Sequence, residues 1–219
     1  LCGLLTHFAE PDDFDFTLKQ RERFTKVFTL IKEFVTEDFL IHADNSSSFL
    51  SLEKESIFNA IRVGLLQFGI APNKKGVLSN LNVEPVLSFH SRLAMMKRLP
   101  EGTTISYGRE HTLRRDSMVG IISAGYGDAI PLHCGNQASA LIRGRDYPII
   151  GRVTMDQTLV DLTDGPHDLV PGEKITLIGK QIDSEISLST LAEHANTIPW
   201  ELLCSITKRV PRIYSMKRE

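Results

Sequence analysis

The clearest indication of fold lies in the stretch Gly151-Arg152-Val153-Thr154-Met155-Asp156-Gln157. Two shorter blocks precede it, Ser106-Tyr107-Gly108 and Gly125-Tyr126-Gly127-Asp128. Each of the three blocks ends a run of β-type residues, so each brings polar or aromatic side chains to a turn between strands. Side chains at such turns contact ligands more often than they pack in a core. We therefore expect a β-structured domain whose turns carry a binding site.

The second part of the chain, residues 85–219, predicts an all-β domain. Runs of β-branched and apolar residues recur at 86–96, 103–107, 118–124, 139–142, 147–161 and 174–178, separated by Gly or Pro. This spacing is typical of a compact, β-barrel-like domain. Two short helices are expected near its end, over 188–195 and 199–205. Ser187 is the expected N-cap of the first, and Pro199 suits the first position of the second.

Residues 1–84 have a different pattern, so the fold class expected for the whole chain is α/β plus all-β. We expect strands over 3–9, 39–43 and 62–69, and a helix over 17–37 with apolar residues at i, i+3 and i+4. This order predicts parallel βα units. Three strands cannot close an eight-stranded barrel. We therefore expect the C-terminal part of a (β/α)8 barrel, and the apolar start at Leu1 without an initiator Met also suggests a fragment.

Composition and charge argue against several functional classes. The chain has 25 basic and 27 acidic residues and a net charge of −2, so nothing favours binding to nucleic acid or to an anionic membrane. Its apolar runs are too short to span a bilayer, and no signal peptide is recognisable. Three cysteines without a CxxC pair favour reduced thiols in a cytoplasmic protein. The spacing of His, Cys and carboxylate residues predicts no metal site.

Three basic side chains in the first part follow predicted parallel strands. His7 and His42 each come at the carboxyl end of a strand, and Arg62 accompanies the third. In an α/β barrel this is the end where ligands bind. A single such histidine is more often a hydrogen-bonded structural residue. Two histidines together with an arginine, which needs partners when buried, indicate a ligand.

Two small-residue pairs are the candidates for holding a phosphate. They are Asn45-Ser46 and Gly64-Leu65. A phosphate needs backbone N–H groups and a hydroxyl, and small residues let the backbone approach it closely. Each pair alone is only a loop or a turn. Their position beside the histidines and the arginine makes the case for an anion site.

Seven blocks, taken in order, resemble the alanine racemases, pyridoxal-phosphate enzymes that interconvert L- and D-alanine. They are Thr6-His7-Phe8-Ala9, His42-Ala43-Asp44-Asn45-Ser46, Arg62-Val63-Gly64-Leu65, Ser106-Tyr107-Gly108, Gly125-Tyr126-Gly127-Asp128, Gly151-Arg152-Val153-Thr154-Met155-Asp156-Gln157 and Arg209-Val210-Pro211-Arg212. Together they run from near the N-terminus almost to the end of the chain. The resemblance implies a racemase of this fold that supplies D-alanine for peptidoglycan.

The resemblance also implies roles for individual residues. Tyr107 would be the base that removes or returns the α-proton on one face of the substrate. A free phenol loses its proton only well above neutral pH, so this chemistry needs hydrogen bonds and positive charge nearby. His7, linked to Arg62 and on to His42, would supply them. Arg62 would face the pyridine nitrogen of the cofactor and keep it unprotonated, which makes the ring a weaker electron sink.

Further contacts with cofactor, substrate and partner follow from the same resemblance. Asn45, Ser46, Gly64 and Leu65 would hold the phosphate, Met155 would contact substrate through its backbone amide, and Asp12, Tyr126, Arg152 and Asp156 would line the entry path. The family forms its sites at a head-to-tail homodimer interface. Tyr107 and Met155 would therefore complete the site of the second chain.

The chain departs from the family pattern at several positions. The lysine that binds the cofactor has no counterpart, and neither has the barrel arginine that binds the substrate carboxylate. Because a Schiff base is obligatory in this chemistry, the 219 residues alone are expected to be inactive. Lys208 stands where some members have a tyrosine that contacts phosphate, Leu132 replaces an arginine of the entry path, and Thr154 replaces a common cysteine.

Other functions stay open. The nearest is a racemase of the same fold acting on serine or another amino acid. A related decarboxylase of basic amino acids is disfavoured, since the Tyr107 and Met155 blocks follow the racemase pattern. From a different class, the chain could be a catalytically inactive remnant, or a binding module that pairs with a separately encoded barrel half.

Overall fold

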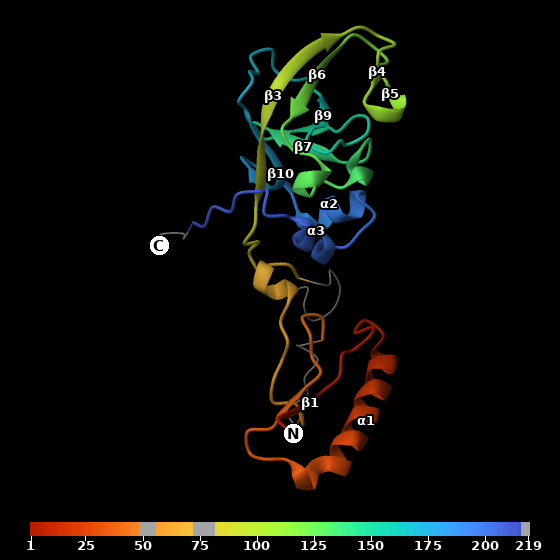
Figure 1. Cartoon of the computed structure of the whole chain (residues 1–219), viewed down its shortest axis with the longest axis vertical. Helices are drawn as coiled ribbons and strands as arrows, with labels where there is room; N and C mark the ends of the chain where they lie inside the picture. The colour runs from red at the N-terminus through yellow and green to blue at the C-terminus, as the bar shows by residue number, and fades with distance from the viewer. Residues whose placement is uncertain (49–55, 72–81, 216–219) are drawn as a thin grey trace. The chain divides into compact units, whose positions relative to one another are not determined.

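The computed structural model describes residues 1–48, 56–71 and 82–215 (Figure 1). The chain divides into two compact units, Leu1–Val86 and Leu87–Glu219. The division lies two residues beyond the one expected after residue 84. None of the helices in the described ranges has the length and apolar character of a membrane span.

The first unit combines a short parallel sheet with one long helix. Strands β1 (Gly3–Leu5) and β2 (Leu40–His42) pair in parallel, with Leu5 opposite His42. Between them lie α1 (Phe14–Ile31) and the 3-10 turn η1 (Lys32–Phe34). The helix begins earlier than expected because the Asp13 side chain caps it, accepting a 2.9 Å hydrogen bond from Phe16 N. The parallel βα unit is thus confirmed.

The apolar face of α1 explains why the helix packs on this sheet. Phe24 is 7% exposed and lies in one cluster with Phe39, which precedes β2, and Ile41, which lies within it. Its ring also lies 5.5 Å from the ring of Phe58. Burying three large apolar side chains contributes roughly 1.5–3 kcal/mol for each, which fixes the position of the strand end that carries His42.

The third strand expected over 62–69 is wrong. Only an isolated parallel bridge joins Arg62 to Asn45, and the chain then forms the 3-10 turn η3 (Leu65–Phe68). Gly69 ends that turn in the left-handed region, with φ 68. The chain leaves the extended region earlier, at Gly64 with φ −114 and ψ −87, so the apolar run forms a turn after a single bridge. Arg62 nevertheless lies beside the ends of β1 and β2.

The second unit is built around a curved antiparallel sheet. The strands follow the order β8 (Arg145–Pro148), β7 (Ser139–Ile142), β10 (Lys174–Gln181), β3 (Phe89–Leu99), β6 (Ser117–Ile122) and β9 (Thr158–Asp161), and β11 (Ser184–Ile186) pairs with β10. An antiparallel bridge between Ile149 and Val160 joins the two ends of this order, so the sheet closes on itself. Inward-facing residues such as Ile122, Ile142 and Ile175 are fully buried.

Two helices lie together at one end of this sheet (Figure 1). They are α2 (Leu188–His194) and α3 (Pro199–Ser205). The Ser187 side chain accepts a 3.0 Å hydrogen bond from Thr190 N, and Pro199 opens α3. Both helices and both of their start signals are as the sequence predicted.

Two of the apolar runs, 103–107 and 147–161, are interrupted by turns that carry candidate site residues. The segment 103–107 is extended only in β4 (Thr104–Ile105), which pairs with β5 (His111–Thr112). The apolar run 147–161 forms β8 and β9, and the turn expected at the 151–157 block lies between them. Gly151 breaks the run at φ 69. A Cβ there would come within 2.9 Å of Ile105 Cγ2, so only glycine fits.

Candidate functional site

A cluster of basic side chains stands at the strand ends of the first unit. Arg62 Nη1 lies 2.6 Å from His42 Nδ1, and Arg62 Nη2 lies 2.9 Å from His7 Nδ1. The guanidinium also donates to the carbonyl oxygens of Thr6 at 3.0 Å and Ala43 at 3.3 Å. Arg62 therefore joins the ends of β1 and β2, and the predicted grouping of these three residues is found.

The proton positions in this cluster follow from the donors present. A guanidinium has only N–H donors, so the nitrogen of each histidine that faces Arg62 must accept. In neutral imidazole the proton then lies on Nε2. His7 Nε2 lies 3.3 Å from the amide nitrogen of Asn45, whose Oδ1 accepts from Ser47 N. The His7 side chain is exposed, so solvent reaches it beside this contact.

The candidate phosphate residues lie next to this cluster. Ser46 is 6% exposed, and its hydroxyl accepts a 2.8 Å hydrogen bond from Gly64 N. Among the described residues, a Cβ on Gly64 would meet only Ser46 Oγ within 4 Å, at 3.8 Å. Exposed backbone and a hydroxyl thus occur together. The Leu65 side chain is buried, so only its backbone could face a ligand.

Asp44 is a residue to which the sequence gave no role. Its side chain is fully buried, and Oδ1 pairs with Arg21 Nη2 at 2.9 Å. The guanidinium of Arg21 stacks on the rings of Phe8 and Phe58, 5.2 Å from each centroid. This pair ties α1 to the loop that carries Asn45 and Ser46. Arg21 and Asp44 are 23 residues apart in the sequence, and helix or strand periodicity does not predict a pairing over that distance.

In the second unit, Tyr107 lies in a strained turn, residues 106–110, here named the tyrosine turn. Ser106 has φ 62 and ψ −174, a conformation that is nearly confined to glycine and costs about 1–3 kcal/mol. Gly108 and Arg109 also have positive φ. Tyr107 itself is 71% exposed. The strain is held by the Ser106 hydroxyl, which donates to Arg152 O at 2.7 Å.

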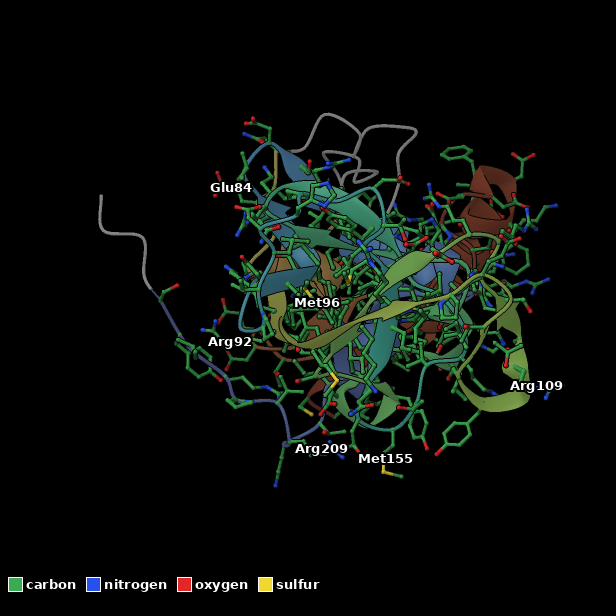
Figure 2. All side chains as sticks on the ribbon, turned by 90° about the horizontal axis from the view of Figure 1, so that it is seen from above. Glu84, Arg92, Met96, Arg109, Met155 and Arg209 are labelled. Atoms are coloured by element: carbon green, nitrogen blue, oxygen red, sulfur yellow. The ribbon has the colours of Figure 1, made fainter. Side chains whose placement is uncertain are left out.

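Arg152 belongs to the second turn of the unit, residues 151–157, here named the methionine turn. Thr154 closes this turn, because its hydroxyl accepts from Gln157 N and donates to Gln157 O. Met155 is 51% exposed, and its side chain points outward in Figure 2. None of the hydrogen bonds found among the described residues uses the Met155 N–H.

The Gly125–Asp128 block packs backbone to backbone on the methionine turn. Tyr126 N donates to Thr154 O, and Gly127 N donates to Met155 O, each at 2.9 Å. A Cβ on Gly125 would come within 2.1 Å of Thr154 O and 2.6 Å of Met155 O. Tyr126 is 44% exposed beside these contacts. The structure thus brings the predicted Tyr126 and Met155 together.

Arg209, which the sequence placed in a motif without a role, links both blocks. Its guanidinium lies 3.1 Å from Asp128 Oδ1 and 2.6 Å from Asp156 Oδ1. The hydrogen bond with Asp156, followed by the charge of Asp128, raises the pKa of Arg209. Figure 2 shows Arg209 and Met155 along the same edge of the view. The C-terminal segment is therefore fastened to the methionine turn.

The remaining predicted entry-path residues are exposed. Arg152 Nη1 lies 3.7 Å from Oε1 of Glu110, the last residue of the tyrosine turn. Asp12 lies in the exposed loop before α1. Leu132 and Lys208 are exposed too. Among the described residues no group of three or more His, Cys, Asp or Glu side chains could hold a metal ion.

Comparison with known proteins identifies the class to which these two units belong. Residues 1–72 match the family model of the alanine racemase N-terminal domain, and residues 86–214 match that of the alanine racemase C-terminal domain. The alanine racemase of Halothermothrix orenii is 36% identical over 217 residues, which are 98% of this chain and 56% of that protein. Alanine racemase 1 of Bacillus subtilis is 35% identical, over 97% of this chain and 53% of its own length.

Solved structures give the same result. The alanine racemase of Bacillus anthracis with bound L-Ala-P has a TM-score of 0.86 at 32% identity, over 98% of this chain and 55% of its own. The enzyme of Bartonella henselae with covalently bound pyridoxal phosphate has a TM-score of 0.85 at 26% identity, over 98% and 57%. The chain belongs to the alanine racemase family. It spans about half the length of the curated relatives it matches.

Proposed function

We propose that this chain is part of a pyridoxal-phosphate-dependent racemase that interconverts L- and D-alanine by a two-base mechanism. The observation that carries the proposal is the Arg62 cluster, with His42 Nδ1 at 2.6 Å and His7 Nδ1 at 2.9 Å. A permanently charged guanidinium with two histidine partners, beside a serine hydroxyl and an open glycine, suits one anionic, aromatic ligand.

The residues of the first unit fit pyridoxal phosphate. The space next to Gly64, where a Cβ would meet only Ser46 Oγ among the described residues, leaves backbone accessible to a phosphate. Asn45, Ser46, Gly64 and Leu65 are the proposed phosphate residues. Arg62 is the proposed partner of the pyridine nitrogen, and its fixed positive charge disfavours a proton there.

The bound cofactor supplies the electron sink that acidifies the α-carbon of an amino acid. Tyr107 then holds or moves the proton on one face of that carbon. The exposed His7 ring, beside the amide of Asn45, is the proposed donor to the Tyr107 oxygen and favours its charged form. His42 and Arg62 keep that histidine proton on Nε2. The Met155 amide contacts the substrate, and Asp12, Tyr126, Arg152 and Asp156 line its approach.

We further propose a homodimer in which Tyr107 and Met155 of one copy complete the cofactor site of the other. Each unit holds complementary parts, an exposed phenol in one and a histidine donor in the other. The first unit is proposed as the last part of a (β/α)8 barrel. Cys2, Cys134 and Cys204, all free thiols, favour a cytoplasmic protein, and peptidoglycan is the proposed use of D-alanine.

Expression with any in-frame upstream coding sequence tests the proposal. We expect a lysine-bearing segment there, visible absorbance from bound cofactor, and racemisation of L-alanine followed by polarimetry. Faster turnover of serine would identify the serine racemase instead. Cofactor binding without turnover of any amino acid, even when the chain is mixed with a separately encoded barrel half, would support a remnant and contradict the enzyme.

A further inference from the structure

Asn136 connects the tyrosine turn with the methionine turn. Its side-chain oxygen Oδ1 lies 2.8 Å from Gly151 N and 3.0 Å from His111 Nδ1. Gly151 begins the methionine turn, and His111 is the first residue of β5, directly after the tyrosine turn. We propose that His111 and Asn136 are positioning residues, which fix Tyr107 relative to Met155 for proton transfer. The proposal rests on the function proposed above.

The atoms of this link allow one arrangement of protons. The backbone N–H of Gly151 can only donate, so the Asn136 atom that faces it is the carbonyl oxygen and not the amide nitrogen. The same oxygen faces His111, so the His111 ring carries a proton on Nδ1 and donates it. The Asn136 oxygen therefore accepts one hydrogen bond from the methionine turn and one from the residue that follows the tyrosine turn.

The base of the tyrosine turn is anchored by the buried Ile105, so the orientation of the exposed tip depends on side-chain links such as this one. Tyr107 is mostly exposed, so packing does not hold it. The β4–β5 hairpin has only two residue pairs, Thr104 with Thr112 and Ile105 with His111. Besides the Ser106 hydroxyl and the 3.7 Å pair of Glu110 with Arg152, the His111–Asn136 hydrogen bond reaches from this hairpin to the base of the methionine turn. Strain at Ser106 would otherwise be released by movement of Tyr107.

Asn136 is held firmly enough to serve as the connecting residue. Its φ of 58 is in the left-handed region, which asparagine adopts more readily than most residues. Asn136 N donates to Ile149 O at 3.2 Å, and the next residue, Gln137, donates from N to the carbonyl of the fully buried Cys134. The side chain thus projects from a backbone that the barrel core fixes.

A matched pair of variants in the complete holoenzyme tests the positioning role. In His111→Asn an N–H donor takes the place of Nδ1, whereas in His111→Asp an acceptor oxygen stands there and faces Asn136 Oδ1. We expect kcat/KM to fall about tenfold or more in the Asp variant, and to stay within about threefold of the parent in the Asn variant. The exposed His167, changed to Ala, is the control.

Isotope effects separate positioning from general damage. For the enantiomer whose α-hydrogen faces Tyr107, the α-deuterium effect on kcat/KM should rise in His111→Asp. For the opposite enantiomer it should fall toward unity, since only one of the two proton transfers is slowed. Equal losses in the Asn and Asp variants, or a loss that leaves both isotope effects unchanged, would overturn the proposal.

A measurement on the unsubstituted chain needs no activity. A long-range proton–nitrogen NMR spectrum should show the His111 proton on Nδ1, and a proton on Nε2 alone would contradict the link even if the Asp variant does not fold. Failure of the proposed function is distinguishable. Normal racemisation by the Tyr107→Phe variant would contradict the proposed function. An inactive Tyr107→Phe variant, together with equal kcat/KM values in the two His111 variants, would contradict only the positioning role.

Discussion

Gly125→Ala tests whether the backbone contact between the Gly125 block and the methionine turn determines the architecture of the second unit. Gly125 has φ −147 and ψ −160, so alanine meets no backbone strain there. The new methyl group would lie 2.1 Å from Thr154 O and 2.6 Å from Met155 O, and ordinary contact begins at 3.4 Å. The methionine turn must therefore move by about 1.3 Å at Thr154, from 2.1 to 3.4 Å.

The size of the effect follows from what this movement disturbs. Overpacking against rigid backbone costs about 1–3 kcal/mol. The two hydrogen bonds from Tyr126 N and Gly127 N to the methionine turn contribute about 0.5–1.5 kcal/mol each, and the lower chain entropy of unfolded alanine returns about 0.4–1 kcal/mol. We expect the free energy of unfolding to fall by about 2–4 kcal/mol.

Urea unfolding followed by the fluorescence of Trp200, the only tryptophan, reports on this unit. Gly172→Ala is the matched control, because Gly172 has φ 96 and a Cβ there would meet nothing within 4 Å. The control variant has the strain of a left-handed alanine without a steric clash, which should lower the free energy of unfolding by about 1 kcal/mol. If Gly125→Ala lowers the free energy of unfolding no more than Gly172→Ala does, the contact between Gly125 and the methionine turn is not rigid and the reasoning fails.

Three other changes give distinct results. Arg62→Gln should weaken pyridoxal phosphate binding at least tenfold, because it removes the charge that joins both histidines. An unchanged affinity in an absorbance titration would contradict the role of the Arg62 cluster in binding the cofactor. Burial raises the pKa of the Cys134 thiol to about 12, so the neutral form is favoured in the fold. Stability should therefore fall as pH rises from about 9 toward 12, and the slope should be smaller in Cys134→Ala; equal slopes in denaturant titrations would contradict this. Arg209→Gln should raise KM more than it lowers kcat, because Asp128 and Asp156 lose their shared cation; KM values for parent and variant that agree at low and high salt would exclude the link.

Local signals explain what the sequence could predict. Helix α3 has its expected bounds, and the Ser187 cap has its expected partner, because a cap or an N1 proline acts within one turn of helix. The grouping of His7, His42 and Arg62 was predictable for a similar reason. Parallel strands bring their carboxyl ends to one edge, and two apolar runs sufficed to place two of those ends.

Tertiary contacts explain what the sequence could not predict. The run after Arg62 is apolar enough for a strand, but it leaves the extended conformation at Gly64 and forms the 3-10 turn η3. The extended segment before Tyr107 stops at Ser106 because its hydroxyl is held by Arg152 O, 46 residues away. No periodic pattern encodes a pairing over that distance. The role of Asn136, which depends on two such pairings, is invisible in the sequence for the same reason.

The most direct test of the central claim is the proton transfer assigned to Tyr107. In the complete holoenzyme, Tyr107→Phe should retain the cofactor's visible absorbance, lose racemisation by at least a thousandfold, and still exchange the α-hydrogen of one alanine enantiomer with deuterated water. Loss of exchange for both enantiomers would point to a damaged site. Racemisation at the parent rate would show that the phenol takes no part in the reaction and would contradict the account.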